Sequence, residues 1–288
     1  TVGVYYRRYA DKLPQGLVTH QTLRNVGTAA RPNYVPLSAF SQYNLIYADG
    51  IDLYGISLAK NIGGISFGSE LSYRHNTPLL SKILGVPGTN PFNVPAPSEG
   101  ETTGPRGNTM HGLVNAVGIL PDTPVFDAAT WALELVWSQW LDVTSGAETF
   151  QAVGYKGCTF NKPTAQAGDK WDGCATKNYV GMGASFTPTW YQVMPGVDMS
   201  APMTFSMGLS GNAATTFGGN QGNGNFSAGL GFDIFQKHRV DLKYIGYFGR
   251  INDYGTSGAL GAQNITQNGF TTLLKDRDFI SLTLKTTF

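Results

Sequence analysis

The feature that most constrains the fold of this sequence is an alternation of apolar with small or polar side chains, repeated in segments of about ten residues. Segment 128–139 shows it most clearly. Its apolar set is Trp131, Leu133, Leu135 and Trp137. Its small or polar set is Thr130, Ala132, Glu134 and Ser138. A two-residue period places the two sets on opposite faces of a β-strand, and tryptophans toward the ends of an apolar stripe resemble the aromatic girdle of a membrane strand.

The same period recurs along the chain and predicts ten strands. Their ranges are 2–10, 39–60, 64–75, 108–120, 126–140, 178–190, 201–210, 225–235, 239–250 and 278–288. A water-soluble sandwich can show this alternation too. The longest apolar runs, such as 112–120, are shorter than the roughly 18 residues of a membrane helix, so a membrane span must consist of strands. We therefore predict an all-β fold, a transmembrane antiparallel β-barrel forming a single domain over 1–288, with about ten crossings, in the outer membrane of a Gram-negative bacterium.

Long and short connections alternate, as in outer-membrane barrels with long external loops and short periplasmic turns. Counting back from Phe288, the predicted external loops are 76–107, 141–177, 211–224 and 252–276. The predicted periplasmic connections are 61–63, 121–126, 191–200 and 236–238. The same count makes 39–60 one long crossing with a kink or bulge at Ala48, Asp49 and Gly50, a break that would open a gap in the wall.

The two ends of the chain carry further expectations. The last segment ends on an aromatic residue, Phe288, which resembles the signal read by the outer-membrane assembly machinery. The first strand begins at once, without a charged and apolar leader ahead of it. This start indicates either a mature N-terminus or a longer chain whose first part precedes Thr1. Ten strands could close alone, but we expect that additional N-terminal sequence completes a larger barrel.

The two cysteines, Cys158 and Cys174, lie in the predicted external loop 141–177. Their setting indicates a disulfide formed in an oxidising compartment, with two free thiols as the alternative. A metal site would lack ligands, because no histidine lies near the pair. The formal charge of +1 comes from 20 basic and 19 acidic residues without a basic cluster, which argues against a nucleic-acid partner.

The strand pattern directs eight charged side chains toward the inside of the predicted barrel. They are Glu70, Arg74, Glu134, Asp233, Arg239, Asp241, Lys243 and Lys285. Two interpretations stay open. The charges form structural ion pairs between neighbouring strands, or they form a constriction that selects solutes. Arg239, Asp241 and Lys243, beside Asp233 on the hairpin partner, are the best candidates for a cluster in the lumen.

Four inward glycines, at positions 181, 183, 229 and 231, either relieve crowding or leave room for a plug, a loop or cargo. Segment 64–68 matches the G-x-S-x-G pattern of a hydrolase nucleophile, but the strand period continues through it and predicts a plain inward Ser66. The histidines lie in loops or at strand ends: His20, His75, His111 and His238. We expect no catalytic residues, no metal and no cofactor.

Several segments together resemble the proteobacterial outer-membrane family catalogued as domain of unknown function 1302. The likeness rests on 5–14, 52–58, 64–74 and 111–127. The resemblance implies an outer-membrane location and a longer chain with an N-terminal half before this region. It also implies a role beside an RND-type inner-membrane transporter and a periplasmic lipoprotein-like protein, with lipid-like or other hydrophobic cargo. It supplies no functional residues.

Three hypotheses about function follow. The first is a channel or transporter for a small, hydrophobic or lipid-like molecule, with outer-membrane lipids, assembly machinery and periplasmic and inner-membrane transport proteins as partners. The second is a structural barrel that anchors an envelope complex without conducting. The third is a hydrolase, which requires that Ser66 and His111 meet in space.

Overall fold

The computed structural model describes residues 1–19, 23–25, 27–28, 30–31, 34–36, 42–81, 84–85, 104–162, 164–216, 218–257 and 262–287. The fold is all-β, as predicted. Within these ranges the only helices are two short 3-10 turns, η1 (Lys170–Asp172) and η2 (Phe270–Leu274). No helix in the described part of the chain has the length and hydrophobicity of a membrane span.

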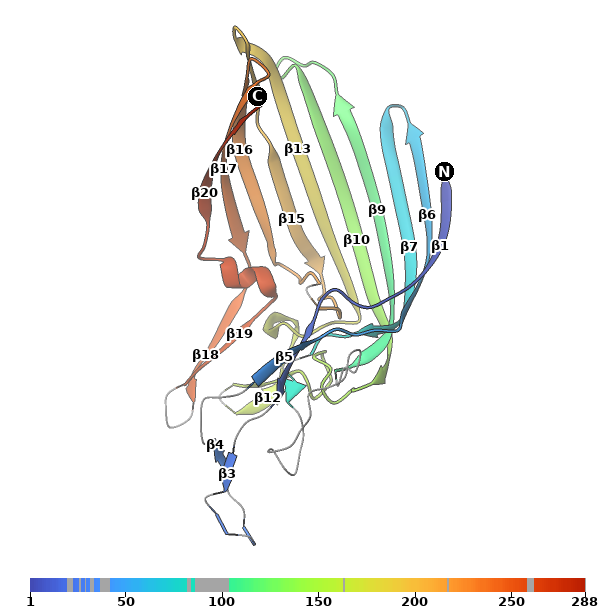
Figure 1. Ribbon diagram of the computed structural model, residues 1–288, viewed down its shortest axis with the longest axis vertical. Helices are drawn as coiled ribbons and strands as arrows, with labels where there is room; N and C mark the ends of the chain where they lie inside the picture. Colours follow the sequence, from blue (N-terminus) through green and yellow to red (C-terminus); the bar gives the residue numbers. More distant parts are fainter. Residues whose placement is uncertain are drawn as a thin grey trace.

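One large antiparallel sheet of eleven strands dominates the structure. Its strands are β1 (Val2–Tyr9), β6 (Ile51–Ile62), β7 (Ile65–Pro78), β9 (Arg106–Leu120), β10 (Ala128–Ser145), β13 (Asn178–Met194), β14 (Val197–Ser200), β15 (Met203–Ser210), β16 (Gly224–Ile234), β17 (His238–Phe248) and β20 (Phe279–Thr286). They make ten passes, because β14 and β15 follow each other between the same neighbours, β13 and β16. Strands β1 and β20 form the two edges and lie on opposite sides of the sheet (Figure 1).

The connections divide the sheet into two ends. At the turn end, β6 and β7 join through Gly63 and Gly64, and β13 and β14 join at Gly196. Positive φ angles of 60°, 84° and 76° at these glycines allow the tight turns. At the loop end, the long segments gather below the sheet (Figure 1). Long and short connections therefore alternate as the sequence predicts.

The long segments carry short strands of their own. One small sheet joins β2 (Gln15–Thr19) to β5 (Gln42–Ile46) and β8 (Leu84–Gly85). The other short strands form three hairpins: β3 (Leu23–Asn25) with β4 (Tyr34–Pro36), β11 (Thr159–Asn161) with β12 (Ala165–Ala167), and β18 (Ile251–Ser257) with β19 (Ala262–Gln267). The last hairpin and η2 occupy most of the predicted loop 252–276.

The predicted single crossing over 39–60 is wrong. Its described first part, β5, pairs with β2 in the small sheet, whereas β6 begins at Ile51 and pairs with β1 and β7. The chain turns at Gly50, where φ is +65°, and Ala48 is held by a hydrogen bond from the Asp11 amide to its carbonyl, 2.7 Å long. Because β6 pairs with β7 without interruption, residues 48–50 connect two sheets and open no gap within β6.

The predicted connection 191–200 is shorter than expected. Strand β13 continues to Met194, and β14 begins at Val197. The register shifts between Trp190 and Met194, and Gln192 takes a φ of 50°. This irregularity breaks the two-residue period, so the sequence pattern ends before the strand does.

The cross-strand register aligns the apolar residues of neighbouring strands on one face of the large sheet and the small or polar residues on the other face. One row of the apolar face runs from β6 to β15 through Leu58, Ser69, Val114, Leu135, Met182 and Met207. One row of the polar face runs from β7 to β17 through Gly68, Asn115, Glu134, Gly183, Ser206, Asn225 and Tyr247. Adjacent rows therefore point to opposite sides.

The main cluster of buried apolar residues in the described part of the chain lies at the loop end. Leu79, Phe150 and Ala152 are fully buried there, next to Ala175 and Ala214. The Trp140 ring contacts the rings of Phe150 and Tyr155 edge to face, at centroid distances of 5.4 and 5.9 Å. The loops are thus packed against each other and against the end of β10.

Candidate functional site

An ion-pair cluster lies on the polar face near the turn end. Arg239 on β17 donates from Nη1 to Asp233 Oδ2 on β16 at 2.5 Å, and from Nε to both carboxylate oxygens of Asp241 at 3.0 Å. Its Nη2 donates to Ser200 Oγ at 3.4 Å. The pairing register places Asp233 opposite Arg239, which brings the charges within reach. We call Ser200, Asp233, Arg239 and Asp241 the ionic cluster.

Two lysines stand on the same face beside this cluster. Lys285 on β20 lies opposite Arg239, and Lys243 lies opposite Ser281. Neither lysine forms an ion pair with a described residue. Together with the ionic cluster they make a patch of three cations and two anions. The structure thus brings five of the eight predicted inward charges together.

The other three inward charges lie elsewhere on the polar face. Glu134 stands in the middle of the sheet, opposite Asn115 and Gly183. Glu70 and Arg74 lie on β7, several strands away from the ionic cluster. The eight residues therefore do not form one ring in this structure.

Three of the four inward glycines make room for their own neighbours. A Cβ on Gly231 would lie 2.7 Å from both Arg239 Nη2 and Asp241 Oδ1. A Cβ on Gly181 would lie 2.2 Å from the Tyr179 hydroxyl, and one on Gly229 would lie 2.6 Å from the Leu242 carbonyl oxygen. Gly183 differs from the other three, because no atom of the described residues lies within 4 Å of an added Cβ.

A pocket of about 300 Å³ lies between the polar face and a loop segment. Side chains of four neighbouring strands form its wall: Ser72, Arg74, His111, Ser138 and Tyr179. Ala213, Thr215, Gly218 and Gly219 form its roof. The Tyr179 hydroxyl reaches the roof so closely that a Cβ on Gly219 would lie 1.8 Å from it. We call this space the roofed pocket.

Three long segments, 146–177, 211–223 and 249–278, interlock at the loop end, and we call their described residues the loop cap. The disulfide between Cys158 and Cys174 closes part of the first segment, with 16 residues of sequence separation, which confirms that prediction. Both cysteines are buried. Asn212 donates to the carbonyl oxygens of Lys170 and Cys174, at 2.6 and 2.8 Å, and joins the first segment to the second.

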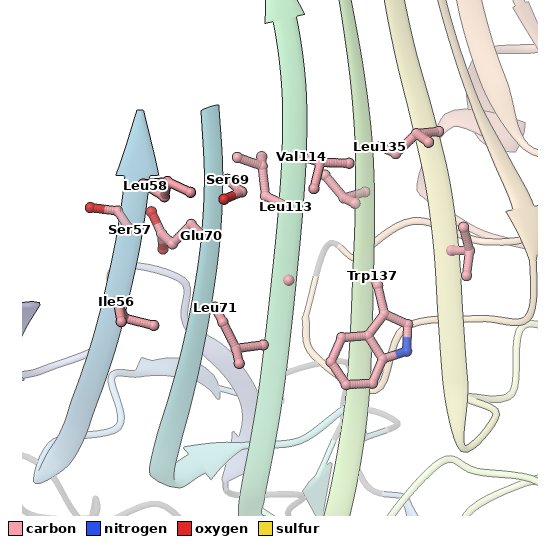
Figure 2. A pocket seen from close by; sticks show the side chains of 13 residues that line it. Ile56, Ser57, Leu58, Ser69, Glu70, Leu71, Leu113, Val114, Leu135 and Trp137 are labelled. Atoms are coloured by element: carbon pink, nitrogen blue, oxygen red, sulfur yellow. The ribbon is translucent and has the colours of Figure 1, made fainter. Parts of the chain in front are cut away.

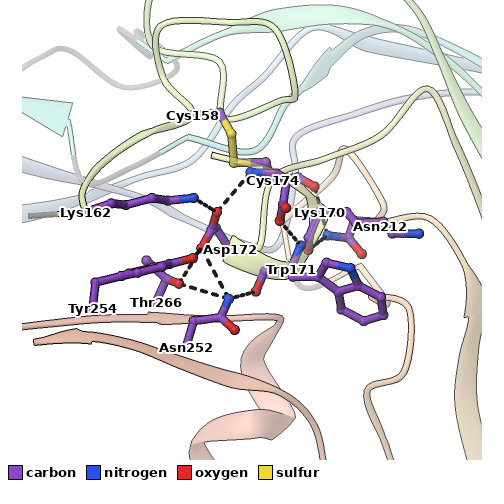
Figure 3. The surroundings of a disulfide bond; sticks show 11 residues. Cys158, Lys162, Lys170, Trp171, Asp172, Cys174, Asn212, Asn252, Tyr254 and Thr266 are labelled. Atoms are coloured by element: carbon purple, nitrogen blue, oxygen red, sulfur yellow. Dashed lines mark hydrogen bonds and ion pairs between the residues drawn. A yellow bond between two sulfur atoms is a disulfide. The ribbon is translucent and has the colours of Figure 1, made fainter. Parts of the chain in front are cut away.

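Asp172 joins the first segment to the third (Figure 3). Its carboxylate forms an ion pair with Lys162 and accepts hydrogen bonds from Tyr254 and Thr266, both 2.6 Å long. Burial alone would raise the pKa of this carboxyl, but the bonds from Lys162, Thr266 and Tyr254 outweigh burial and hold the pKa well below its usual value. Asp172 is therefore a buried anion that ties two loops together.

Sequence patterns did not single out the loop cap network. The available signal was local: Asp169 and Asp172 have the spacing of a helix capping box, and η1 shows that box. Several asparagines in 211–223 were a second signal. Asn223 and Asn220 bond Asn268, joining the second segment to the third. The partners lie far apart in the sequence, so only the fold reveals them.

The apolar face carries a shallow groove of about 450 Å³ (Figure 2). Apolar side chains from five neighbouring strands line it: Ile56, Leu58, Leu71, Val114, Leu135, Trp137 and Val180. Gly112 forms its floor, and a Cβ there would lie 3.2 Å from the Trp137 ring. The groove is not enclosed, so a molecule in contact with the apolar face can enter it.

The predicted hydrolase pair does not come together. Ser66 lies opposite Val117, and His111 lies opposite Ser72, six positions further along β7. At about 3.3 Å per strand residue this separates them by roughly 20 Å. His111 Nε2 instead pairs with Thr109 Oγ1 at 3.0 Å. Phe288 and His20 lie outside the described residues.

These features define a class: an all-β protein built on one large antiparallel sheet with an apolar and a polar face, capped at one end by interlocked loops. The chain belongs to the family described as protein of unknown function DUF1302, whose model matches residues 1–288. The resemblance seen in the sequence is thus confirmed. No curated protein and no solved structure matches the chain.

Proposed function

We propose that this protein forms the wall of an outer-membrane β-barrel and that the barrel moves a small, hydrophobic or lipid-like molecule across the membrane. The observation that carries this proposal is the exposed apolar face. On β20 alone, Ile280, Leu282 and Leu284 are 71%, 63% and 70% exposed. Each such side chain gains about 1.5–3 kcal/mol when it leaves water. An apolar face spread over ten passes suits lipid, whereas soluble monomers rarely expose apolar patches above a few hundred Å².

Aromatic side chains on the apolar face support the same proposal. Tyr6, Tyr54 and Tyr73 lie side by side toward the loop end, with ring centroids 5.1 and 6.4 Å apart. Trp131 marks the turn-end part of β10. Tyrosine and tryptophan rings at both ends of an apolar band are typical of strands whose ends lie at the two membrane interfaces.

The proposal requires that the two sheet edges find partners. Backbone groups without hydrogen bonds cost several kcal/mol each in lipid, so spanning sheets close into barrels. Strands β1 and β20 are the edges of the described sheet. We propose that both edges pair with further strands and that the polar face then lines the lumen of a larger barrel.

In that lumen the charged patch would be exposed to solutes. Arg239 is neutralised by Asp233 and Asp241, which favours a structural role for these three. Lys243 and Lys285 add positive charge without an ion-pair partner among the described residues. Rows of charged side chains set pore selectivity, and we propose that the two lysines favour anionic solutes.

The partners are proposed from the family resemblance. An RND-type inner-membrane transporter and a periplasmic protein would supply the energy and the path for cargo across the envelope. The barrel would then be the outer-membrane part of this system, with the loop end outside and the turn end in the periplasm.

Flux through the full-length protein in liposomes tests the proposal. We expect a conductance with a preference for anions, and we expect Lys285→Glu to lower the anion-to-cation permeability ratio several-fold. Arg277→Glu, a charge reversal at an exposed residue of the loop cap, is the matched control and should leave the ratio unchanged. Absence of any flux, both with and without envelope partners, would sink the channel proposal.

One observation favours the alternative, a docking barrel that anchors an envelope complex without conducting. The loop cap is tightly bonded, and the roof of the roofed pocket covers part of the polar face. A sealed lumen together with stable co-purification of a periplasmic protein would support this alternative.

A further inference from the structure

The roofed pocket has the form of a built binding site. Its roof is fixed to the buried apolar cluster at the loop end, because the Leu80 amide donates to the Ala214 carbonyl at 2.6 Å and Ala214 belongs to that cluster. Within the roof, the Ala213 amide donates to the Gly219 carbonyl at 2.9 Å. The pocket therefore lies between two ordered surfaces.

Arg74 is a cation at the edge of this pocket whose bonding is incomplete. Among the described residues its buried Nε has no hydrogen-bond partner and its side chain forms no ion pair. A buried donor without an acceptor destabilises the protein, and a charged donor does so more strongly than a neutral one. An acceptor that enters the pocket would relieve this cost.

The surroundings of Arg74 indicate which acceptor fits. A guanidinium presents parallel N–H donors that match the two oxygens of a carboxylate. Ser72 occupies the next inward position of the same strand as Arg74, with His111 and Ser138 opposite it on the two following strands. Leu113 and Val136 form an apolar surface in the next inward row of the pocket wall. The pocket thus offers a site for an anionic head and a separate apolar region.

Size and net charge narrow the ligand class. A volume of about 300 Å³ lies at the lower end of the range of about 300–1,000 Å³ that is typical of small-molecule pockets. Glu70 also lines the pocket, and its negative charge disfavours a ligand with two or more negative charges. The pocket therefore fits a small monoanion.

We propose that the roofed pocket binds a small monocarboxylate with a short apolar chain, held by Arg74. The proposal that the pocket binds a ligand depends only on the geometry of the pocket. The further proposal that this ligand is transported cargo rests on the proposed transport function. Arg74 would contact the carboxylate, and Leu113 and Val136 would contact the chain.

Calorimetric titration of the full-length protein with hexanoate tests the site, with hexylamine and hexanol as probes of the same length. We expect saturable binding of hexanoate and weaker binding of the other two. Arg74→Gln should weaken hexanoate binding about tenfold or more, as expected for a lost hydrogen bond to a charged group. Arg74→Lys should restore part of it, and Arg277→Gln should have no effect.

Ser138→Leu provides a second variant, because it fills the pocket and keeps Arg74. It should abolish hexanoate binding even where Arg74→Gln fails to fold. A preference for hexylamine, or hexanoate binding that neither variant weakens, would overturn the proposal, as would the absence of saturable binding. Measuring flux as well distinguishes the two proposals. Flux without Arg74-dependent hexanoate binding would refute only the binding-site proposal. Arg74-dependent binding without flux would refute only the channel proposal.

Discussion

At the scale of single residues, we expect substitution of Asp172 to destabilise the loop cap strongly. Its side chain is fully buried, and that of its partner Lys162 is 13% exposed. It also accepts a backbone bond from Asp169 at 3.0 Å. A buried charge is tolerated only when it is paired and hydrogen-bonded, and Asp172 meets both conditions.

The depressed pKa of Asp172 makes the loop cap sensitive to acid. A carboxyl whose pKa is lower in the folded state stabilises the fold fully above its unfolded pKa of 3.8, and this contribution disappears as the pH falls through the folded pKa. We expect hydrogen-exchange protection factors in segment 158–174 to be constant from pH 7 to about pH 4 and to fall below that. Asp172→Asn should remove about 3–5 kcal/mol of local stability at pH 7 and abolish the acid dependence.

Asp276→Asn is the matched control, because Asp276 belongs to the same loop cap but is 85% exposed. It should leave the protection factors unchanged at every pH. Equal loss in both variants, or an acid dependence that survives Asp172→Asn, would contradict the role assigned to Asp172.

At the scale of elements, the sheet repeatedly pairs a glycine on one strand with an aromatic residue on the neighbouring strand. Gly55 lies opposite Tyr5, Gly112 opposite Trp137, and Gly246 opposite Phe226. In each pair the ring lies over the glycine of the neighbouring strand. Such cross-strand pairs contribute to strand register, because the ring fits only where the Cβ is missing.

The pair of Tyr5 on β1 and Gly55 on β6, at one edge of the sheet, tests this packing argument. A Cβ on Gly55 would lie 2.2 Å from the Tyr5 ring. We expect Gly55→Ala to displace the ring and to cost about 1–3 kcal/mol of β1–β6 pairing, measured by hydrogen exchange of the β1 amides. Gly183→Ala is the control, because it places the same methyl group in open space on the same face. A larger effect of Gly183→Ala would refute the packing argument.

At the scale of the whole molecule, the decisive property is that β1 and β20 lie at opposite edges of the sheet. Ten passes that closed on themselves would bring these strands side by side. The proposed larger barrel keeps them apart, with further strands between them.

Paired cysteines distinguish the two arrangements. We expect no cross-link within one chain between cysteines placed at Val2, Val4 or Tyr6 on β1 and at Ile280, Leu282 or Leu284 on β20, using a short bis-methanethiosulfonate reagent. Leu242→Cys with Leu282→Cys is the positive control, because these positions face each other on β17 and β20. Efficient cross-links between β1 and β20 in one chain would show that the ten passes close alone.

The sequence by itself determined the all-β class, most of the ten passes, the alternation of connections and the family. These follow from local rules, because side-chain period, turn residues and loop length act over a few neighbouring positions. It also placed Asp233, Arg239 and Asp241 on one face of one hairpin, where register alone brings them together.

Only the tertiary structure decided the rest. In the tertiary structure, segment 42–46 pairs with β2 and not with the large sheet, and β13 continues through an irregular stretch. Asp172 accepts hydrogen bonds from Tyr254 and Thr266, which lie far away in the sequence. It also brought Ala213, Thr215, Gly218 and Gly219 into one pocket with Arg74. The physical reason is that strand partners and loop contacts depend on residues up to 94 positions apart, and no local period encodes which distant segment supplies a hydrogen bond.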